Sequence, residues 1–239
     1  MGDEKLERIA KVIARAGVCS RRDAEKLIAE GKVEVDGEKI DTPAIKVSTS
    51  QIIKIDGKEI AKIDKPRLWV FHKPIGVVTT HKDEKGRKTV FDCLPENLPR
   101  VISIGRLDIN TEGLLLLTND GELARHIELP ATGWVRTYRV RVHGRVNEEA
   151  LKKLKNGVKI DGVSYGNIDA KLERSGGKSN SWISISITEG KNREVRKICE
   201  HLGLQVNRLI RTSYGEFKLG NLGIGEIKEV PEKKVGELI

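Results

Sequence analysis

Cysteine, aromatic side chains and long hydrophobic runs are all scarce in this 239-residue sequence. Its three cysteines are odd in number and widely spaced, which argues against a disulfide framework or a cysteine-based zinc site and favours a reducing cytoplasm. The longest uninterrupted aliphatic run, Leu114 to Leu117, is far shorter than the roughly 18 residues of a membrane span. Residues 1–30 alternate in charge and have no apolar signal core. We therefore expect a cytoplasmic protein that does not contact a membrane.

Several motifs that carry common chemistries are also missing. The glycine loops GxGxxG and GxxxxGK[ST], which hold nucleotide phosphates, do not occur, and neither does the GxSxG nucleophile elbow. The five histidines are scattered without metal-ligand spacing. We therefore expect no cofactor and no metal.

The charge of the chain is concentrated in two blocks. Lys and Arg number 44 against 35 Asp and Glu, which gives a net charge of +9. Residues 65–107 and 171–218 each carry a net charge of +5, whereas residues 1–64 and 108–170 are neutral. Such blocks suit a polyanionic partner, although charge alone does not distinguish this from an ordinary solvated surface.

The first sixty residues have the pattern of a small module of two helices and two hairpins. Apolar residues at helical spacing predict a helix over 6–16, and Ser20 with Asp23 three residues later predicts the N-cap of a second helix. Asp-Gly pairs at 36–37 and 56–57 predict hairpins. The candidates for contact with phosphates in this module are Arg8, Arg15, Ser20, Arg21, Arg22, Lys26 and Lys32.

The rest of the chain mixes strand and helix signals, and their order predicts an α+β fold with a mainly antiparallel sheet. Residues 136–143 alternate, so that Tyr138 shares one face of a strand with two valines while Arg139 and Arg141 share the other. Residues 68–80 read as two strands broken at 74–76. Further strands are expected at 182–190 and 206–219, and helices at 148–157 and 194–203.

One polar loop, GRLDINTEG, precedes the buried strand predicted at Leu114 to Leu117. It carries Arg106, Asp108 and Glu112. A carboxylate in a loop that leads into a buried strand can be held rigidly, and nearby arginines would keep it ionised. A turn aspartate is the ordinary alternative, and the residues alone favour it.

Three stretches resemble a known family. The run ERIAKVIARAGVCSRRDAEKLIAEGKVEVDGEKI resembles the S-four-type RNA-binding domain, and GRLDINTEGLLLLTNDGELA resembles the catalytic signature of ribosomal RNA pseudouridine synthases. EGKNREVRKICEHLGLQVNRLIRTSYGEFKL resembles the second signature of that family. The resemblance implies an RNA-binding domain over 1–62, a linker over 63–68, and a catalytic domain with the pseudouridine synthase fold over 69–239.

The resemblance also implies roles for individual residues. Asp108 would be the catalytic aspartate, Tyr138 would stack on the target base, Arg196 would pair with Asp108, and Leu209 would line the uracil pocket. Arg136 stands where the family would have Lys. A simple contact with a phosphate or a loop would be kept after this change, whereas a bidentate contact could be lost.

Two walls of an RNA cleft are expected on either side of Asp108. One wall comes from the first basic block and the other from the second, and each phosphate contact would steepen the salt dependence of binding. The residues expected in the cleft are Lys73, Lys82, Lys85, Arg87, Lys88 and Arg106 on the first side, and Lys191, Asn192, Arg193, Lys197, Arg208 and Arg211 on the second.

The implied reaction converts uridine to pseudouridine in ribosomal RNA. It breaks the N1-glycosidic bond, turns the uracil and joins C5 to the ribose, so it needs no cofactor. The aspartate would act either as a nucleophile or by removing a ribose proton, and the sequence leaves both routes open. A general glycosidase needs two opposed carboxylates, and we interpret Glu112 as structural.

We expect a monomer whose target uridine is unpaired or flipped out of a structured ribosomal RNA. The similarity favours large-subunit RNA. A small-subunit substrate and a non-catalytic ribosome-assembly factor are the alternatives.

Overall fold

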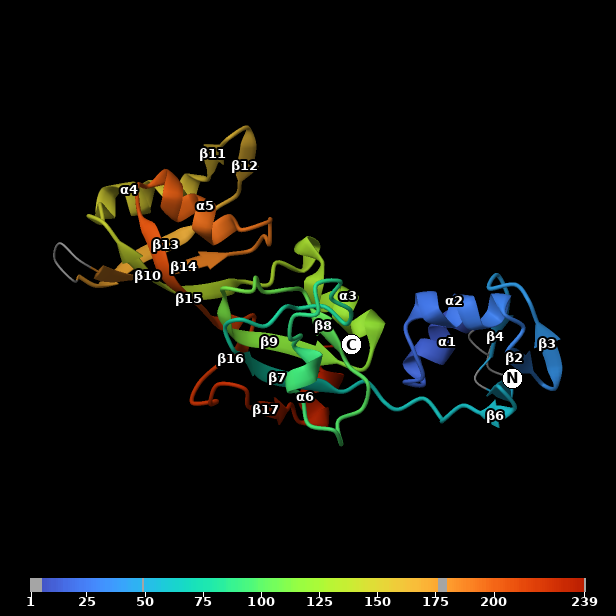
Figure 1. The fold of residues 1–239 in the computed structure, drawn as a ribbon. Coiled ribbons are helices and arrows are strands. Elements are labelled where there is room, and N and C mark those ends of the chain that lie inside the picture. The colour runs from blue at the N-terminus through green and yellow to red at the C-terminus, as the bar shows by residue number, and fades with distance from the viewer. Residues whose placement is uncertain (1–5, 49, 176–179, 239) are drawn as a thin grey trace. The chain divides into compact units, whose positions relative to one another are not determined.

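The computed structural model describes residues 6–48, 50–175 and 180–238, and they form two compact units (Figure 1). The N-terminal unit comprises residues 1–67 together with 97–102 and 119–121, and the C-terminal unit comprises 68–96, 103–118 and 122–239. The domain bounds predicted from the sequence, at 62 and 69, remain a proposal.

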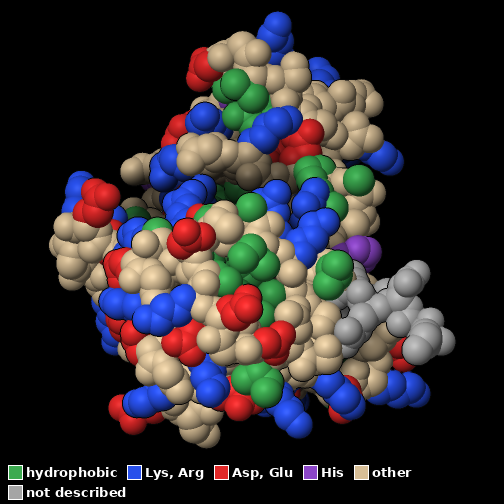
Figure 2. Space-filling model, turned by 90° about the vertical axis from the view of Figure 1, so that its right-hand side faces the viewer, with side chains coloured by type: hydrophobic (Ala, Val, Ile, Leu, Met, Phe, Trp, Pro, Cys, Tyr) green, Lys and Arg blue, Asp and Glu red, His purple; other side chains and the backbone are tan. Residues whose placement is uncertain are grey.

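Charged residues make up 33% of the chain. On the face shown in Figure 2, Lys and Arg side chains are interspersed with Asp and Glu, and hydrophobic side chains gather in separate groups. Side chains of both charges are therefore exposed on the surfaces seen in this view. Within the described ranges, no helix has the length and apolar character needed to cross a membrane.

The N-terminal unit contains the two helices and two hairpins predicted from its sequence. Helix α2 starts as its capping pattern predicts, because the Ser20 hydroxyl accepts a hydrogen bond from the Asp23 amide and donates one to Asp23 Oδ2. Asp36 and Gly37 both have positive φ, as the hairpin turn requires. The elements are α1 (Ile9–Arg15), α2 (Arg21–Ala29), β1 (Glu7–Arg8), β2 (Val33–Val35), β3 (Glu38–Ile40), β4 (Lys46–Val47), β5 (Ile53–Ile55) and β6 (Lys58–Glu59); the sheets are β3-β2-β5-β6 and β1-β4.

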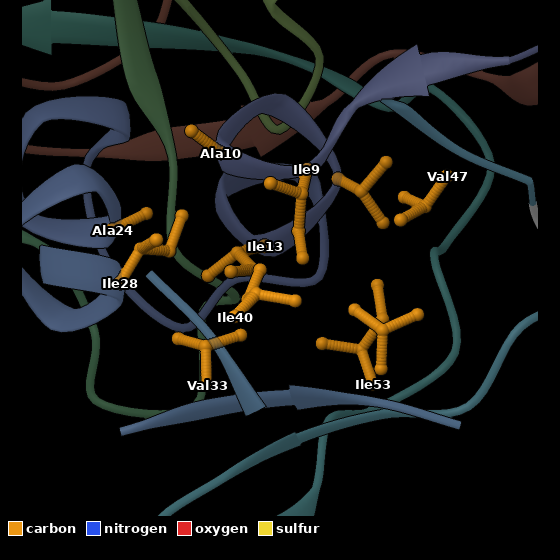
Figure 3. Packing of buried hydrophobic residues seen from close by; sticks show 11 residues of the cluster. Ile9, Ala10, Ile13, Ala24, Ile28, Val33, Ile40, Val47 and Ile53 are labelled. Carbon is orange, nitrogen blue, oxygen red and sulfur yellow. The ribbon is translucent and has the colours of Figure 1, made fainter. Parts of the chain in front are cut away.

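A compact hydrophobic core joins these helices to the sheet (Figure 3). Ile13 from α1 and Ile28 from α2 are fully buried, and they meet Val33 and Ile53 from β2 and β5. Full burial of such a side chain contributes about 1.5–3 kcal/mol. Because a domain of about 60 residues buries only a modest share of its surface, this unit depends on these few contacts.

The C-terminal unit is built on a nine-stranded sheet with the order β13-β14-β10-β15-β9-β7-β17, from which β16 pairs with β15 and β8 with β9. Among the described residues, β15 pairs with β9 in parallel, whereas β13–β14, β14–β10, β10–β15, β15–β16, β9–β7 and β7–β17 are antiparallel, so the predicted mainly antiparallel α+β architecture is confirmed. The strands are β7 (Leu68–Lys73), β8 (Ile102–Ile104), β9 (Glu112–Thr118), β10 (Arg136–His143), β13 (Asp169–Arg174), β14 (Asn180–Ile187), β15 (Gln205–Tyr214), β16 (Phe217–Lys218) and β17 (Ile227–Glu229), with a separate hairpin of β11 (Val158–Ile160) and β12 (Val163–Tyr165).

Helices α4 and α5 lie on the same side of β13, β14, β10 and β15 (Figure 1). They cover the face that carries Val140, Ile183 and Leu209, whose exposed fractions are at most 4%. The helices are α3 (Gly121–Glu128), α4 (Glu148–Lys153), α5 (Glu194–His201) and α6 (Glu232–Gly236), with 3-10 turns at Phe91–Cys93, Pro130–Thr132 and Leu154–Asn156.

The prediction of two strands over 68–80 is wrong for the second strand. Beyond β7, Val78 forms only an isolated bridge with Thr89. Gly76 has a φ of 86° and turns the chain out of the sheet, and its amide donates to the carbonyl of Ile109. This segment therefore uses its hydrogen bonds to hold a neighbouring loop instead of extending the sheet.

The parallel pair β9 and β15 joins the two halves of the sheet at Gly113. Strand β9 is buried along its whole length, and Gly113 pairs with Arg211. Gly113 has a φ of 106°, and a Cβ atom there would lie 2.3 Å from the Arg211 carbonyl oxygen. Only glycine therefore allows the two strands to approach this closely.

We predict that Gly113→Ala lowers the free energy of unfolding by roughly 3 kcal/mol or more, because it adds a backbone clash to an unfavourable φ. Chemical denaturation measures this value. Gly203→Ala is the matched control, since Gly203 also has positive φ but open space around its Cβ position, and it should cost about 1–2 kcal/mol. Equal costs for the two variants would contradict the role of the close approach.

Candidate active site

A cavity of about 660 Å³ lies within the C-terminal unit. Residues of β10 and β15, the start of α5, and the loops before β9 and after β7 line it. All four residues with predicted catalytic roles are among the lining residues, namely Asp108, Tyr138, Arg196 and Leu209. The volume falls in the usual range for small-molecule sites, and a nucleotide base with its ribose is of that size.

The loop that carries Asp108 is held in place by hydrogen bonds that its backbone carbonyls accept. Five consecutive carbonyl oxygens, from Leu107 to Thr111, each accept a hydrogen bond from another segment or side chain. The donors, in chain order of the acceptors, are Thr79 Oγ1, Lys73 Nζ, the Gly76 amide, Arg196 Nη2 and again Lys73 Nζ. An irregular loop fixed at every carbonyl holds its side chains in one arrangement.

Lys73 is the centre of this network. Its side chain is fully buried at the end of β7, and Nζ donates to the carbonyls of Pro74 at 3.0 Å, Asp108 at 3.2 Å and Thr111 at 2.9 Å. Burial lowers the pKa of Lys73 to about 8, against a smaller opposing effect of the nearby Asp108. The sequence placed Lys73 on the RNA-binding wall, but a buried ammonium whose three donors are all used does not contact RNA.

The Asp108 carboxylate faces two arginines from the start of α5. Its Oδ2 lies 3.9 Å from Arg193 Nη1 and 4.0 Å from Arg196 Nε, and its side chain is 36% exposed to the cavity and solvent. These distances exceed a hydrogen bond, so the carboxylate oxygens remain available for other contacts. Burial, and next the charge of Arg193, lower the pKa of the Arg196 guanidinium from its usual value.

The local conformation at the start of α5 orients these two arginines. Arg193 has a φ of 52°, an uncommon conformation for a residue other than glycine. The buried Glu194 side chain accepts a hydrogen bond from the Lys191 amide, and Val195 and Ile198 anchor the helix on the sheet. Strain of this kind persists only where the surroundings hold it, and such sites are commonly functional.

Tyr138 and Leu209 form the apolar side of the cavity. They lie on the same face of the adjacent strands β10 and β15, and their exposed fractions are 8% and 4%. Behind them, Arg136 donates to the Thr188 carbonyl at 2.6 Å and to Tyr214 Oη at 2.7 Å, and its guanidinium lies over the Tyr214 ring. The sequence did not predict this role, in which the planar guanidinium of Arg136 links its own strand to Thr188 and Tyr214.

Buried polar atoms without partners gather at this cavity. Among the described residues, four buried side-chain nitrogen or oxygen atoms have no hydrogen bond, and three of them belong to lining residues: Thr111 Oγ1, Arg196 Nε and Arg211 Nη2. Such groups are rare in folded proteins and call for an explanation. A polar ligand at this site is the simplest one.

The residues predicted to bind RNA in the C-terminal unit are only partly brought together. Arg87, Arg106, Lys191, Asn192 and Arg193 line the cavity, with Arg87 paired to Asp83 and Lys191 to Glu189. Lys85 is exposed but outside the lining. Arg211 also lines the cavity, but it is buried, and its Nε donates a hydrogen bond to the Leu114 carbonyl.

Arg208 lies on the opposite face of the sheet from the cavity. Its neighbour Leu209 faces the cavity, and Arg208 itself pairs with the buried Glu112. Strand alternation therefore removes Arg208 from the predicted wall. The ion pair agrees with the structural interpretation of Glu112.

In the N-terminal unit, Arg8, Arg21, Arg22, Lys26 and Lys32 are exposed. Of these, Lys26 pairs with Asp23 at 3.9 Å and Lys32 with Glu30 at 2.7 Å. Of the other candidates, Arg15 pairs with Glu7 at 2.7 Å and Ser20 caps α2. Over the part of the chain that the structure describes, no group of three or more His, Cys, Asp or Glu side chains could hold a metal ion.

Comparison with known proteins gives consistent matches over both units. Residues 67–201 match the RNA pseudouridylate synthase family, and residues 7–53 match the S4 domain. An uncharacterized RNA pseudouridine synthase of Rickettsia typhi is 53% identical over 98% of this chain and 96% of its own. Ribosomal large subunit pseudouridine synthase B of Bacillus subtilis is 40% identical over 98% of this chain and 96% of its own.

A solved structure agrees with these sequence matches. The crystal structure of a pseudouridylate synthase superposes with a TM-score of 0.67 at 26% identity, covering 97% of this chain and 99% of that one. The chain therefore belongs to the RNA pseudouridylate synthase family, and it is an RNA pseudouridine synthase with an N-terminal S4 domain.

Proposed function

We propose that this enzyme converts a uridine of large-subunit ribosomal RNA to pseudouridine in the 660 Å³ cavity, with Asp108 as the reacting group. The name of the Bacillus subtilis relative supports the choice of RNA. The observation that carries the site assignment is the Asp108 carboxylate, which faces the cavity between Arg193 and Arg196 without being hydrogen-bonded to either.

The chemistry needs one ionised carboxylate beside the ribose of the target. Arg193 and Arg196 place positive charge about 4 Å from Oδ2 without forming a hydrogen bond to it, so its lone pairs stay open. The fixed carbonyls of the loop keep the carboxylate in place, so little reorganisation is needed at the moment of reaction. The carboxylate then attacks the sugar or removes its proton, and the C1′–N1 bond breaks. The freed uracil turns and C5 bonds to the sugar, while the carboxylate leaves the sugar or returns its proton. Loss of the C5 proton and protonation of N1 complete the isomerisation.

The target base occupies the apolar side of the cavity. Tyr138 stacks on the uracil and Leu209 packs against it, which requires the nucleotide to leave its own stack. Arg87, Arg106 and Lys191 at the lining contact the flanking phosphates. Because the reaction rearranges atoms within the substrate, these side chains suffice and no cofactor takes part.

We predict that Asp108→Asn lowers the single-turnover rate constant about 10³-fold or more while RNA affinity changes little, because the amide keeps the shape but not the charge. Chemical mapping of pseudouridine in ribosomal RNA, from deletion cells rescued by each variant, gives the cellular readout. Asp169→Asn, an exposed carboxylate on β13, is the matched control and should rescue fully. Modification restored by Asp108→Asn would remove Asp108 from its role, and an unchanged map on deletion would refute the function.

We also predict that the rate falls as pH rises above about 8. The folded-state pKa of Lys73 is about 8 against an ordinary value of 10.5, and the neutral amine has two N–H groups for three carbonyls. Between pH 8 and pH 10.5, Lys73 is more protonated in the unfolded chain than in the folded one. The contribution of Lys73 to the free energy of unfolding therefore increases with pH in this range. The fall in rate is therefore not caused by loss of stability at this group.

Single-turnover rates and melting temperatures measured together from pH 7 to 9.5 test this prediction. A Lys73→Arg protein that folds stays charged throughout and should lack the fall. A wild-type rate that is flat across this range would show that the Lys73 charge does not support the loop.

A further inference from the structure

The outer face of the sheet, opposite α4 and α5, is open to solvent. Along β10 the side chains alternate, so that Tyr138 and Val140 are buried on the inner face while Arg139 and Arg141 are exposed on the outer one. Strand β10 is central, with β14 and β15 on its two sides. Among the described residues, therefore, no element covers this face at Arg139 and Arg141.

Cations and one tryptophan dominate this face. The register puts Arg208, Arg141 and Trp182 in one row across β15, β10 and β14, and puts Arg139, Ser184 and Lys171 in the next row. The carboxylates on this face are Glu112, which pairs with Arg208, Glu173, which pairs with Arg139, and Asp169. Among the described residues, Arg141 and Lys171 have no ion-pair partner.

Two features distinguish this surface from an ordinary solvated face. Arg141 and Arg208 are directly opposed on adjacent strands, where like charges destabilise a sheet. The Arg139 guanidinium lies 4.6 Å from the centroid of the half-buried Trp182 ring, so the two present a flat, charged platform. Nucleic-acid bases stack on aromatic rings and on guanidinium planes.

We propose that the outer sheet face, with Arg139, Arg141, Lys171 and Trp182, binds a second segment of the substrate RNA, away from the target uridine. This proposal rests on the proposed function for the identity of the RNA. Tyr138 and Arg139 are neighbours on one strand but point to opposite faces, so RNA in the cavity does not reach the platform without passing round the sheet edge. The phosphates of the second segment neutralise the opposed arginines, and one of its bases stacks on the platform.

The test measures RNA binding without turnover, so it stands apart from the test of Asp108. A double variant, Arg141→Glu with Lys171→Glu, is titrated against a large-subunit ribosomal RNA transcript over a range of salt concentrations. We expect about tenfold weaker binding or more, and a plot of log K against log salt that is shallower by about 1.4, for two lost single-strand phosphate contacts. Trp182→Leu should weaken binding by about fivefold or more through lost stacking.

The control variant, Lys228→Glu with Lys233→Glu, makes the same charge change near β17 at the other end of the sheet and should bind as wild type does. The single Arg141→Glu variant should melt close to the wild-type temperature, because Arg141 is exposed and Arg208 keeps its own partner, Glu112. Weaker binding by a protein that is not destabilised excludes misfolding as the cause.

Three results would overturn the proposal. Binding by the double variant could equal that of the control. The loss could be just as large on a short hairpin that carries only the target uridine, which would place the contact at the target itself. The loss could appear only with ribosomal particles and not with naked RNA, in which case the partner is a protein.

Discussion

The proposed catalytic arrangement depends on the buried ammonium of Lys73 and the carbonyls to which it donates hydrogen bonds. Leaving a buried carbonyl unpaired costs about 1–3 kcal/mol, and Lys73 satisfies three of them at the base of the loop that carries Asp108. The Asp108 carboxylate itself forms no hydrogen bond with Arg193 or Arg196. The backbone is therefore fixed while the reactive side chain stays open, which is what a pre-organised carboxylate requires.

Side chains alternate between the two faces of the sheet, so the two faces carry different kinds of residue. One face of β10 and β15 supplies Tyr138 and Leu209 to the cavity, and the other supplies Arg139, Arg141 and Arg208 to solvent. Gly113 permits the close parallel contact that brings the Asp108 loop to the end of β15. A single sheet can in this way present apolar side chains to the cavity on one side and charged side chains to solvent on the other.

Local sequence patterns predicted much of this structure. Alternation placed Tyr138 opposite Arg139, Ser20 with Asp23 marked a helix start, and the leucine run marked β9. Long-range contacts did not show in the sequence: nothing in the polar stretch around Lys73 indicates burial, and the Arg208–Glu112 pair joins residues far apart in the chain. The role of Asp108 came from family resemblance, since loop chemistry alone favoured an ordinary turn.

The most direct test is to replace Lys73 with methionine, which keeps an unbranched side chain only one atom shorter but has no donors. Single-turnover rate and RNA affinity are then measured separately. The account predicts a rate constant lower by about 100-fold or more with RNA affinity unchanged, in a protein whose circular dichroism matches wild type. Lys85→Met, at an exposed position outside the cavity lining, is the matched control. Reduced RNA affinity with an unchanged rate constant would contradict it, because Lys73 would then act as an RNA contact and not as the support of the Asp108 loop.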